Sequence, residues 1–285
     1  MTVTPLEPPD SAWSDWGGDG PALHLAHANG FPAGSYRSLI GQLTPSFHVV
    51  SMEARPLWPD ADPATLPGWH PMADDLRCEL RRRGLRGLLG VGHSLGGTLT
   101  ALAAAADPGL FSAVVLIDPV IFTWPRSWLM AAVRRLGLMR RFPLVRHARE
   151  RRDHWPGRDA VRTAYRGRRT FAGWTPEAFE DYLGAGFADA AGGGVRMRYP
   201  REWEARIFEV CPSDVWRELA RIAVPVLFLR GEASDTFLKS AARRGGRQIA
   251  GASTIEVAGS SHFLPFERPA EVAREIIRFA AEVGS

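Results

Sequence analysis

A serine, two aspartates and a histidine, residue types that can together cleave an acyl bond, stand out in this chain. Ser94 lies in the run Gly-His-Ser-Leu-Gly at residues 92–96, and Asp118, Asp235 and His262 follow it in that order. A serine hydroxyl is a weak nucleophile at neutral pH and needs a base to take its proton. Histidine suits that role because its ordinary pKa lies near 6.5, and a carboxylate can fix its tautomer. These residues predict acyl transfer through a covalent serine intermediate.

The segment around Ser94 has the pattern of a strand, a sharp turn and a helix. Residues 88–91 form a short apolar run typical of a buried strand, and an Ala- and Leu-rich helical stretch follows the turn. At so sharp a turn the serine backbone is strained, and side chains at Gly92 and Gly96 would clash with the neighbouring strand and helix. The first free helix amides, starting with Leu95, would then face a substrate carbonyl. The alternative is a glycine-rich turn whose serine only caps the helix.

Strands and helices alternate along much of the remaining chain. The patterns predict strands at residues 22–27, 47–52, 113–119, 224–231 and 253–257, and helices at residues 35–43, 69–83, 214–222, 241–249 and 268–281. Residues 11–20 predict only a poorly defined strand or turn. Such alternation indicates a mostly parallel, doubly wound sheet with its site at the carboxyl ends of the strands. Asp118 stands at one such end, and His262 lies in a loop beyond the last strand.

The motif at Ser94 and the order serine, aspartate, histidine resemble the α/β-hydrolase family. The resemblance extends from about residue 22 to the C-terminus, except for a middle segment, and it implies an α/β-hydrolase fold. It assigns Ser94 as the nucleophile and His262 as the base. In the family a carboxylate a few residues beyond the strand at 224–231 is the usual acid, which favours Asp235. Some members take the acid from the strand after the elbow helix, where Asp118 stands, so Asp118 is the second candidate.

The loop after the strand at 22–27 is similar to the oxyanion-hole loop of the same family. It reads His-Ala-Asn-Gly-Phe at residues 27–31, with two residues inserted after the histidine. Acyl transfer needs two amides about 3 Å from the developing oxyanion, and we assign them to Phe31 and Leu95. His27 and Asn29 are expected to brace the loop by hydrogen-bonding its backbone.

Residues 120–212 interrupt the alternation of strands and helices. They are rich in tryptophan, arginine and glycine, with helical patterns at residues 127–138 and 176–187. A helical insertion at this point resembles the cap domain of many α/β-hydrolases. We therefore expect a core of residues 1–119 and 213–285 and a mainly helical cap of residues 120–212. Its aromatic residues either line an apolar pocket or join the cap to the core, and its arginines either attract anionic substrates or form a solvated surface.

Composition limits the other function classes. The chain has 285 residues, 45% of them hydrophobic and 23% charged, as expected for a globular catalytic domain with an insertion. No apolar run reaches membrane-span length, and the N-terminus has no signal-peptide pattern. With only Cys78 and Cys211, we expect a cytoplasmic protein with reduced thiols. The net charge of +4 comes without a nucleic-acid-binding motif. We expect a small-molecule substrate, no cofactor or metal, and neither nucleic acid nor membrane as partner; the oligomeric state is open.

The expected function is hydrolysis of a carboxylic ester or related acyl bond of a small hydrophobic substrate. A serine at the elbow argues against the relatives that use a carboxylate nucleophile. Lactonase, thioesterase and carbon–carbon bond hydrolase are alternatives, because most of them share acyl transfer through serine. A hydrolase-like scaffold that binds a ligand without turnover is an alternative from another class.

Overall fold

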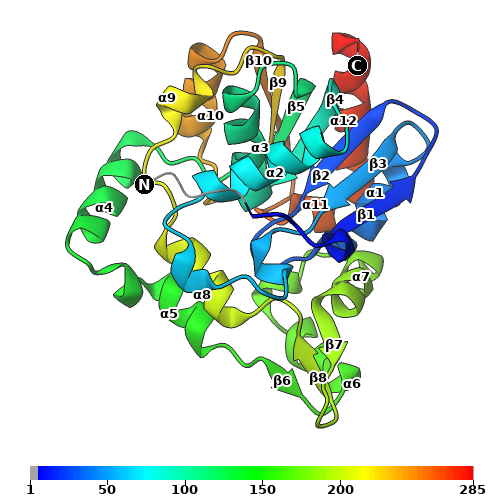
Figure 1. Cartoon of the computed structure of the whole chain (residues 1–285), viewed down its shortest axis with the longest axis vertical. Helices are drawn as coiled ribbons and strands as arrows, with labels where there is room; N and C mark the ends of the chain where they lie inside the picture. Colours follow the sequence, from blue (N-terminus) through cyan, green and yellow to red (C-terminus); the bar gives the residue numbers. More distant parts are fainter. Residues whose placement is uncertain (1–5, 285) are drawn as a thin grey trace.

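A single twisted sheet forms the centre of the molecule (Figure 1). The structure, a computed structural model, describes residues 6–284. The sheet has the order β1-β3-β2-β4-β5-β9-β10, with the strands β1 (Trp13–Gly17), β2 (Ala22–Ala26), β3 (His48–Met52), β4 (Leu88–His93), β5 (Phe111–Ile117), β9 (Val226–Gly231) and β10 (Ala252–Val257). Neighbouring strands are parallel except for β1, which pairs antiparallel with β3. The prediction of a mostly parallel sheet is confirmed.

Helices cover both faces of this sheet. One core lies under α2 (His70–Arg82), α3 (Leu95–Ala106), α9 (Trp216–Leu219) and α10 (Lys239–Gln248), and the other under α1 (Arg37–Leu43), α11 (Leu264–Glu267) and α12 (Pro269–Val283). Side chains alternate between the faces of a strand. Val114 and Leu116 of β5 therefore enter the first core, whereas Val115 and Ile117 enter the second. Burial on both faces explains why β5 is apolar throughout.

The inserted segment (residues 120–212) lies between β5 and β9 in the chain and occupies the left margin and the lower part of the molecule in Figure 1. Its helices are α4 (Trp124–Arg135), α5 (Pro143–Glu150), α6 (Arg158–Arg166), α7 (Pro176–Gly186) and α8 (Arg201–Glu209). It also holds a small antiparallel sheet in the order β6-β8-β7, made of β6 (His154–Trp155), β7 (Phe187–Asp189) and β8 (Val195–Met197). Strands of two or three residues are too short to show alternation, so the sequence did not predict them.

Short 3₁₀ helices connect the main elements. They are η1 (Asp10–Ala12), η2 (Ala33–Tyr36), η3 (Arg55–Leu57), η4 (Pro63–Thr65), η5 (Met139–Arg141) and η6 (Arg169–Phe171). The helix predicted at 214–222 is shorter than expected, because after α9 the amides of Arg221 and Ile222 bond to carbonyls three residues back instead of four. Within residues 6–284, no helix is long and apolar enough to cross a membrane. Cys78 and Cys211 are free, and Cys211 is buried.

Candidate active site

Ser94 stands on a strained turn between β4 and α3. Its φ is 55° and its ψ is −114°, a conformation that a non-glycine residue adopts only where the surroundings enforce it. A Cβ on Gly92 would lie 2.4 Å from the carbonyl oxygen of Gly96, and a Cβ on Gly96 would lie 2.2 Å from that of Ala26. Both glycines are therefore required for β4, α3 and the end of β2 to pack together. The predicted strand, turn and helix are present.

His262 lies in the loop after β10 and meets Ser94 and Asp118 with its two ring nitrogens. Nε2 is 3.0 Å from Ser94 Oγ, and Nδ1 is 2.6 Å from Asp118 Oδ2. Glu267 holds this loop, since its carboxylate accepts from the amide of Ser261 at 2.6 Å and from its hydroxyl at 2.7 Å. Because Asp118 accepts, Nδ1 carries the proton and the free lone pair of Nε2 faces the serine hydroxyl.

Asp118 is fully buried directly after β5, with a φ of 41°. The Ser234 hydroxyl donates to Oδ2 at 2.5 Å, and the Gly231 amide donates to Oδ1 at 3.3 Å. Together with His262, these donors compensate a carboxylate that has no contact with water. Gly231 is the last residue of β9, the neighbour of β5 in the sheet, and Ser234 lies in the turn that follows it.

The structure reverses the expected order of the two aspartates: Asp118, not Asp235, lies against His262. Asp235 is exposed, and its backbone carbonyl accepts a hydrogen bond from Arg126. Its side-chain carboxylate accepts a hydrogen bond from the Thr236 hydroxyl, 3.5 Å away. The chain leaves β9 through a turn closed by the Ser234 amide and the Gly231 carbonyl at 3.0 Å. This turn directs the Ser234 side chain toward Asp118 and leaves the Asp235 side chain at the surface. The geometry therefore favours Asp118 over Asp235 as the carboxylate that orients His262.

The two predicted oxyanion donors differ in what they contact. Leu95 is the first residue of α3, so its amide has no acceptor within the helix. The Phe31 amide instead donates to the Ala28 carbonyl at 3.2 Å, closing a turn in which Gly30 has a φ of 85°. Their role as a pair of donors to a substrate stays a prediction. The loop at residues 27–31 packs closely against α3: a Cβ on Gly96 would also lie 2.6 Å from the carbonyl oxygen of His27.

His27 and Asn29 hold this loop in different ways. His27 Nδ1 donates to the Ala28 carbonyl at 2.9 Å, and Nε2 accepts from the Ala54 amide at 2.9 Å. Burial lowers the pKa of His27, which favours this neutral form. The bracing role expected for His27 is confirmed. Asn29 donates instead to the Glu204 carbonyl in α8 at 3.1 Å, so it ties the loop to the inserted segment rather than to its own backbone.

A buried chain of hydrogen bonds links the loop at residues 27–31 to the backbone of His262. The Tyr36 hydroxyl accepts from the Ala28 amide at 3.0 Å and donates to His93 Nδ1 at 2.7 Å. His93 Nε2 then donates to the His262 carbonyl at 2.9 Å. A carbonyl can only accept, so this ring is protonated at Nε2 and the whole chain is satisfied. Burial holds the pKa of His93 well below its usual value, and a proton on the neighbouring His262 ring would lower it further.

Sequence reasoning missed Tyr36, and nothing local to its position could have found it. His93 lies inside the Gly-His-Ser-Leu-Gly run, but its partners are 57 and 169 residues away in the chain. Its position in the run was the one available signal. Glu267, likewise missed, lies near His262 in sequence and is recognisable only once the loop is folded.

Aromatic rings gather beside His262, where the core meets the inserted segment. The Phe31 ring lies 5.3 Å from Tyr182, 5.8 Å from Trp174 and 5.7 Å from Phe263, measured between centroids. Trp174 also stacks on Phe266 at 4.1 Å. Tyr182 and Trp174 come from the inserted segment, and the other rings come from the core. This aromatic cluster is in contact with the His262 ring through Phe263.

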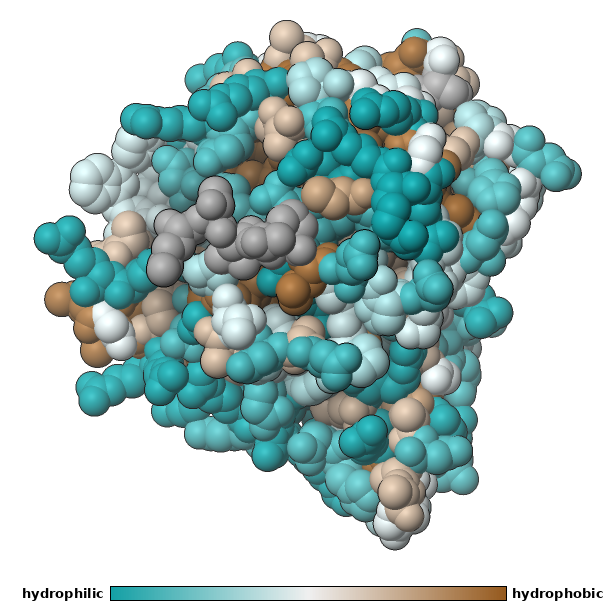
Figure 2. All heavy atoms as spheres, in the orientation of Figure 1, coloured by the Kyte–Doolittle hydropathy of each residue, from teal (hydrophilic) through white to brown (hydrophobic). Residues whose placement is uncertain are grey.

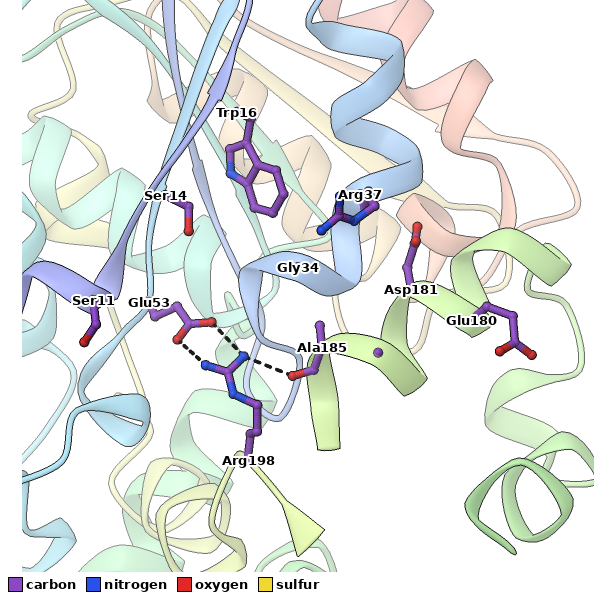
Figure 3. Close-up of a pocket in the computed structure, with 11 residues that line it drawn as sticks. Ser11, Ser14, Trp16, Gly34, Arg37, Glu53, Glu180, Asp181, Ala185 and Arg198 are labelled. Carbon is purple, nitrogen blue, oxygen red and sulfur yellow. Dashed lines mark hydrogen bonds and ion pairs between the residues drawn. The ribbon is translucent and has the colours of Figure 1, made fainter. Parts of the chain in front are cut away.

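A separate cavity of about 360 Å³ opens along the seam between the core and α7 (Figure 3). Figure 3 shows Arg198 reaching from the inserted segment to Glu53, 3.0 Å away, and to the Ala185 carbonyl, 3.1 Å away. Near this cavity Asp181 of α7 accepts from the Ser38 amide at 2.7 Å. These polar contacts hold the inserted segment against the core.

Within residues 6–284, no cluster of histidine, cysteine, aspartate or glutamate side chains is arranged to hold a metal ion.

Comparisons with known proteins agree with this architecture. Type I acyl-CoA thioesterase mpaH from Penicillium roqueforti (strain FM164) is 35% identical over 96 residues, covering 33% of this chain but only 20% of that protein. E-2-(Acetamidomethylene)succinate hydrolase superposes with a TM-score of 0.79 at 21% identity, covering 94% of each chain. The thioesterase domain from the curacin biosynthetic pathway gives a TM-score of 0.70 at 16% identity, covering 93% of this chain and 94% of that one.

The two superpositions are below 25% identity and show a shared fold. The match to a family is broader, because the model of the alpha/beta hydrolase family aligns with residues 25–275. That span runs from β2 into α12 and includes Ser94, Asp118 and His262. This chain belongs to the alpha/beta hydrolase family.

Proposed function

We propose that this chain is a serine hydrolase that cleaves a carboxylic ester, or a related acyl bond, of a small apolar substrate through an acyl-enzyme. One observation carries the proposal: Ser94 Oγ lies 3.0 Å from His262 Nε2, and the other ring nitrogen lies 2.6 Å from Asp118. A nucleophile, a base and a carboxylate that orients the base thus lie in one hydrogen-bonded line.

The proposed reaction uses these groups in two half-reactions. His262 Nε2 takes the Ser94 proton as Oγ attacks the substrate carbonyl carbon, and the carbonyl oxygen becomes an oxyanion. The Leu95 amide donates to that oxyanion, and the Phe31 amide serves as the second donor when it turns from Ala28. The imidazolium gives its proton to the leaving alcohol, and the carbon–oxygen bond breaks. Water, deprotonated by the same histidine, then hydrolyses the acyl-enzyme and regenerates the serine.

The surroundings of Ser94 support an apolar acyl group. The aromatic cluster described above lies next to His262, whose ring centroid is 5.3 Å from that of Phe263. Ser94 itself is only 7% exposed, which favours a substrate that enters a narrow, largely dry site. Exclusion of water also strengthens the hydrogen bonds to the developing oxyanion.

A thioester is the second candidate substrate. It is favoured by the sequence match to an acyl-CoA thioesterase, although that match covers a minority of both chains. The same groups suffice for it, because a thiol instead of an alcohol leaves the tetrahedral intermediate. The choice between the two substrates depends on contacts with the leaving group, on the side of the site formed by the inserted segment.

The test is turnover of paired esters and thioesters that share one acyl chain, over a series of chain lengths. We expect hydrolysis by the wild type, and a loss of kcat of at least about a thousandfold for Ser94→Ala and for His262→Ala. The ratio of kcat/KM for each ester–thioester pair identifies the preferred leaving group. Binding of these compounds without turnover by the folded wild type would instead favour a ligand-binding scaffold.

A further inference from the structure

Helix α4 turns its apolar side chains outward. Trp124 and Trp128, four residues apart in the helix, are 56% and 67% exposed, and Leu136, directly after its last residue, is 69% exposed. The buried residues of the helix are Ser127 and Met130. An amphipathic helix normally buries its apolar face, whereas α4 buries Met130 but exposes both of its tryptophans. We call the exposed set the α4 patch: Trp124, Trp128, Leu129, Leu136, Leu138 and Leu144.

Positive charge accompanies the α4 patch. Residues 124–150 contain seven arginines and one carboxylate, Glu150. Arg135, Arg141 and Arg146 are exposed, and no ion pair of theirs occurs in the part of the chain that the structure describes. Arg134 donates to the Cys211 carbonyl and has no ion pair with any of the residues 6–284. The surface therefore combines exposed indole and leucine side chains with a local excess of cations.

We infer that the α4 patch docks this protein onto the surface of an anionic lipid bilayer. Tryptophan prefers the headgroup region, leucine reaches the acyl chains, and arginine is attracted to anionic headgroups. One occupant thus accounts for both the apolar and the charged side chains. The proposal departs from the expectation, drawn from the sequence, that no membrane is a partner. It concerns adsorption at the interface, so it is compatible with the finding that no described helix could span a membrane. It is independent of the proposed catalytic function.

The position of α4 suits such contact. Figure 1 places α4 at the outer margin of the molecule, away from the central sheet, and Figure 2 shows hydrophobic residues gathered at that margin beside hydrophilic ones. The two tryptophan rings stack with centroids 6.2 Å apart, which presents them as one continuous apolar surface. A patch of several large apolar side chains is uncommon on a monomer unless it makes contact with something.

Vesicle co-sedimentation tests the inference directly. Full-length protein is mixed with vesicles of phosphatidylcholine alone, or with vesicles in which phosphatidylglycerol replaces part of it. We expect binding to the anionic vesicles that weakens as salt is added. Trp128→Ser with Leu129→Ser should reduce the partition coefficient at least about tenfold. Arg135→Gln with Arg141→Gln and Arg146→Gln should reduce it about fivefold for each charge removed.

A matched control separates the α4 patch from general charge effects. Arg86→Gln with Arg169→Gln and Arg196→Gln removes three exposed arginines that, like Arg135, Arg141 and Arg146, have no ion pair among residues 6–284, and this variant should bind anionic vesicles within about twofold of the wild type. Circular dichroism and thermal unfolding verify that each variant is folded.

Three results would overturn the inference. The first is a wild type that stays in solution with both kinds of vesicle. The second is a control variant that loses as much binding as the α4 variants. The third is a dimer, seen by light scattering without lipid, that Trp128→Ser with Leu129→Ser dissociates, because the α4 patch would then join two copies of this chain.

Discussion

Replacing Asp118 by asparagine tests the line from Asp118 through His262 to Ser94. The substitution removes one charge and exchanges one oxygen for an NH₂ group of nearly the same size. Asparagine also tolerates the positive φ of 41° at this position better than most residues. The backbone should therefore keep its course, and any loss of activity should come from the exchanged atom.

The structure gives the consequence for each orientation of that amide. With NH₂ in the place of Oδ2, 2.6 Å from His262 Nδ1, the ring must accept there, so its proton moves to Nε2 and it can no longer take the proton of Ser94. With NH₂ in the place of Oδ1, this NH₂ group lies 3.3 Å from the Gly231 amide. Both groups are hydrogen-bond donors, so the hydrogen bond is lost. In both cases no negative charge stabilises the imidazolium. We expect kcat to fall about 10³- to 10⁴-fold, or about 4 to 5.5 kcal/mol in the barrier.

The matched control is Asp235→Asn, which makes the same chemical change at an exposed carboxylate. Its kcat should stay within about twofold of the wild type, because only its backbone carbonyl contacts another element. The assay is steady-state hydrolysis of the best substrate from the ester and thioester panel, with thermal unfolding of both variants. Normal activity of Asp118→Asn together with a large loss in Asp235→Asn would refute the assignment.

Three further predictions follow from buried contacts. Tyr36→Phe leaves the Ala28 amide and His93 Nδ1 without their hydrogen-bond partner and should lower the free energy of unfolding in urea by about 1–3 kcal/mol. It should also lower kcat more than it changes KM. Burial lowers the pKa of His24 to about 3 and also holds the pKa values of His27 and His93 below 6.5, so the unfolded chain binds more protons as pH falls below 6.5. Stability should therefore decrease from pH 7.5 to 5, with about 2 kcal/mol of the decrease coming from His24, and His24→Asn should remove that contribution. Gly96→Ala places a Cβ 2.2 Å from a backbone oxygen and should lower the unfolding free energy by about 3 kcal/mol, seen as a reduced Tm and lost activity.

The sequence was sufficient for the features that local pattern determines. The run at residues 92–96 needs its glycines whatever the rest of the chain does, so Ser94 and its turn were predictable. The parallel sheet followed from apolar strands alternating with helices, and β5 was recognisable because both of its faces are buried. His262 followed from its place beyond the last strand, as the resemblance implies.

The sequence was insufficient where the outcome depends on which strands are neighbours. Asp118 and Asp235 both follow predicted strands, and their order along the chain does not distinguish them. The strand order β4-β5-β9 places the end of β5 beside the serine, and a turn stabilised by Ser234 moves Asp235 to the surface. The outward face of α4 was equally unpredictable, because its spacing of tryptophan and leucine is that of an ordinary buried face.

The central claim is that Ser94 is an activated nucleophile. The most direct measurement is the intact mass of the wild type and of Ser94→Ala after treatment with a fluorophosphonate, with the adduct located by peptide mapping. The account predicts a single adduct on the wild type, at Ser94, and none on Ser94→Ala. A folded wild type that takes no label, or one labelled at another residue, would contradict it.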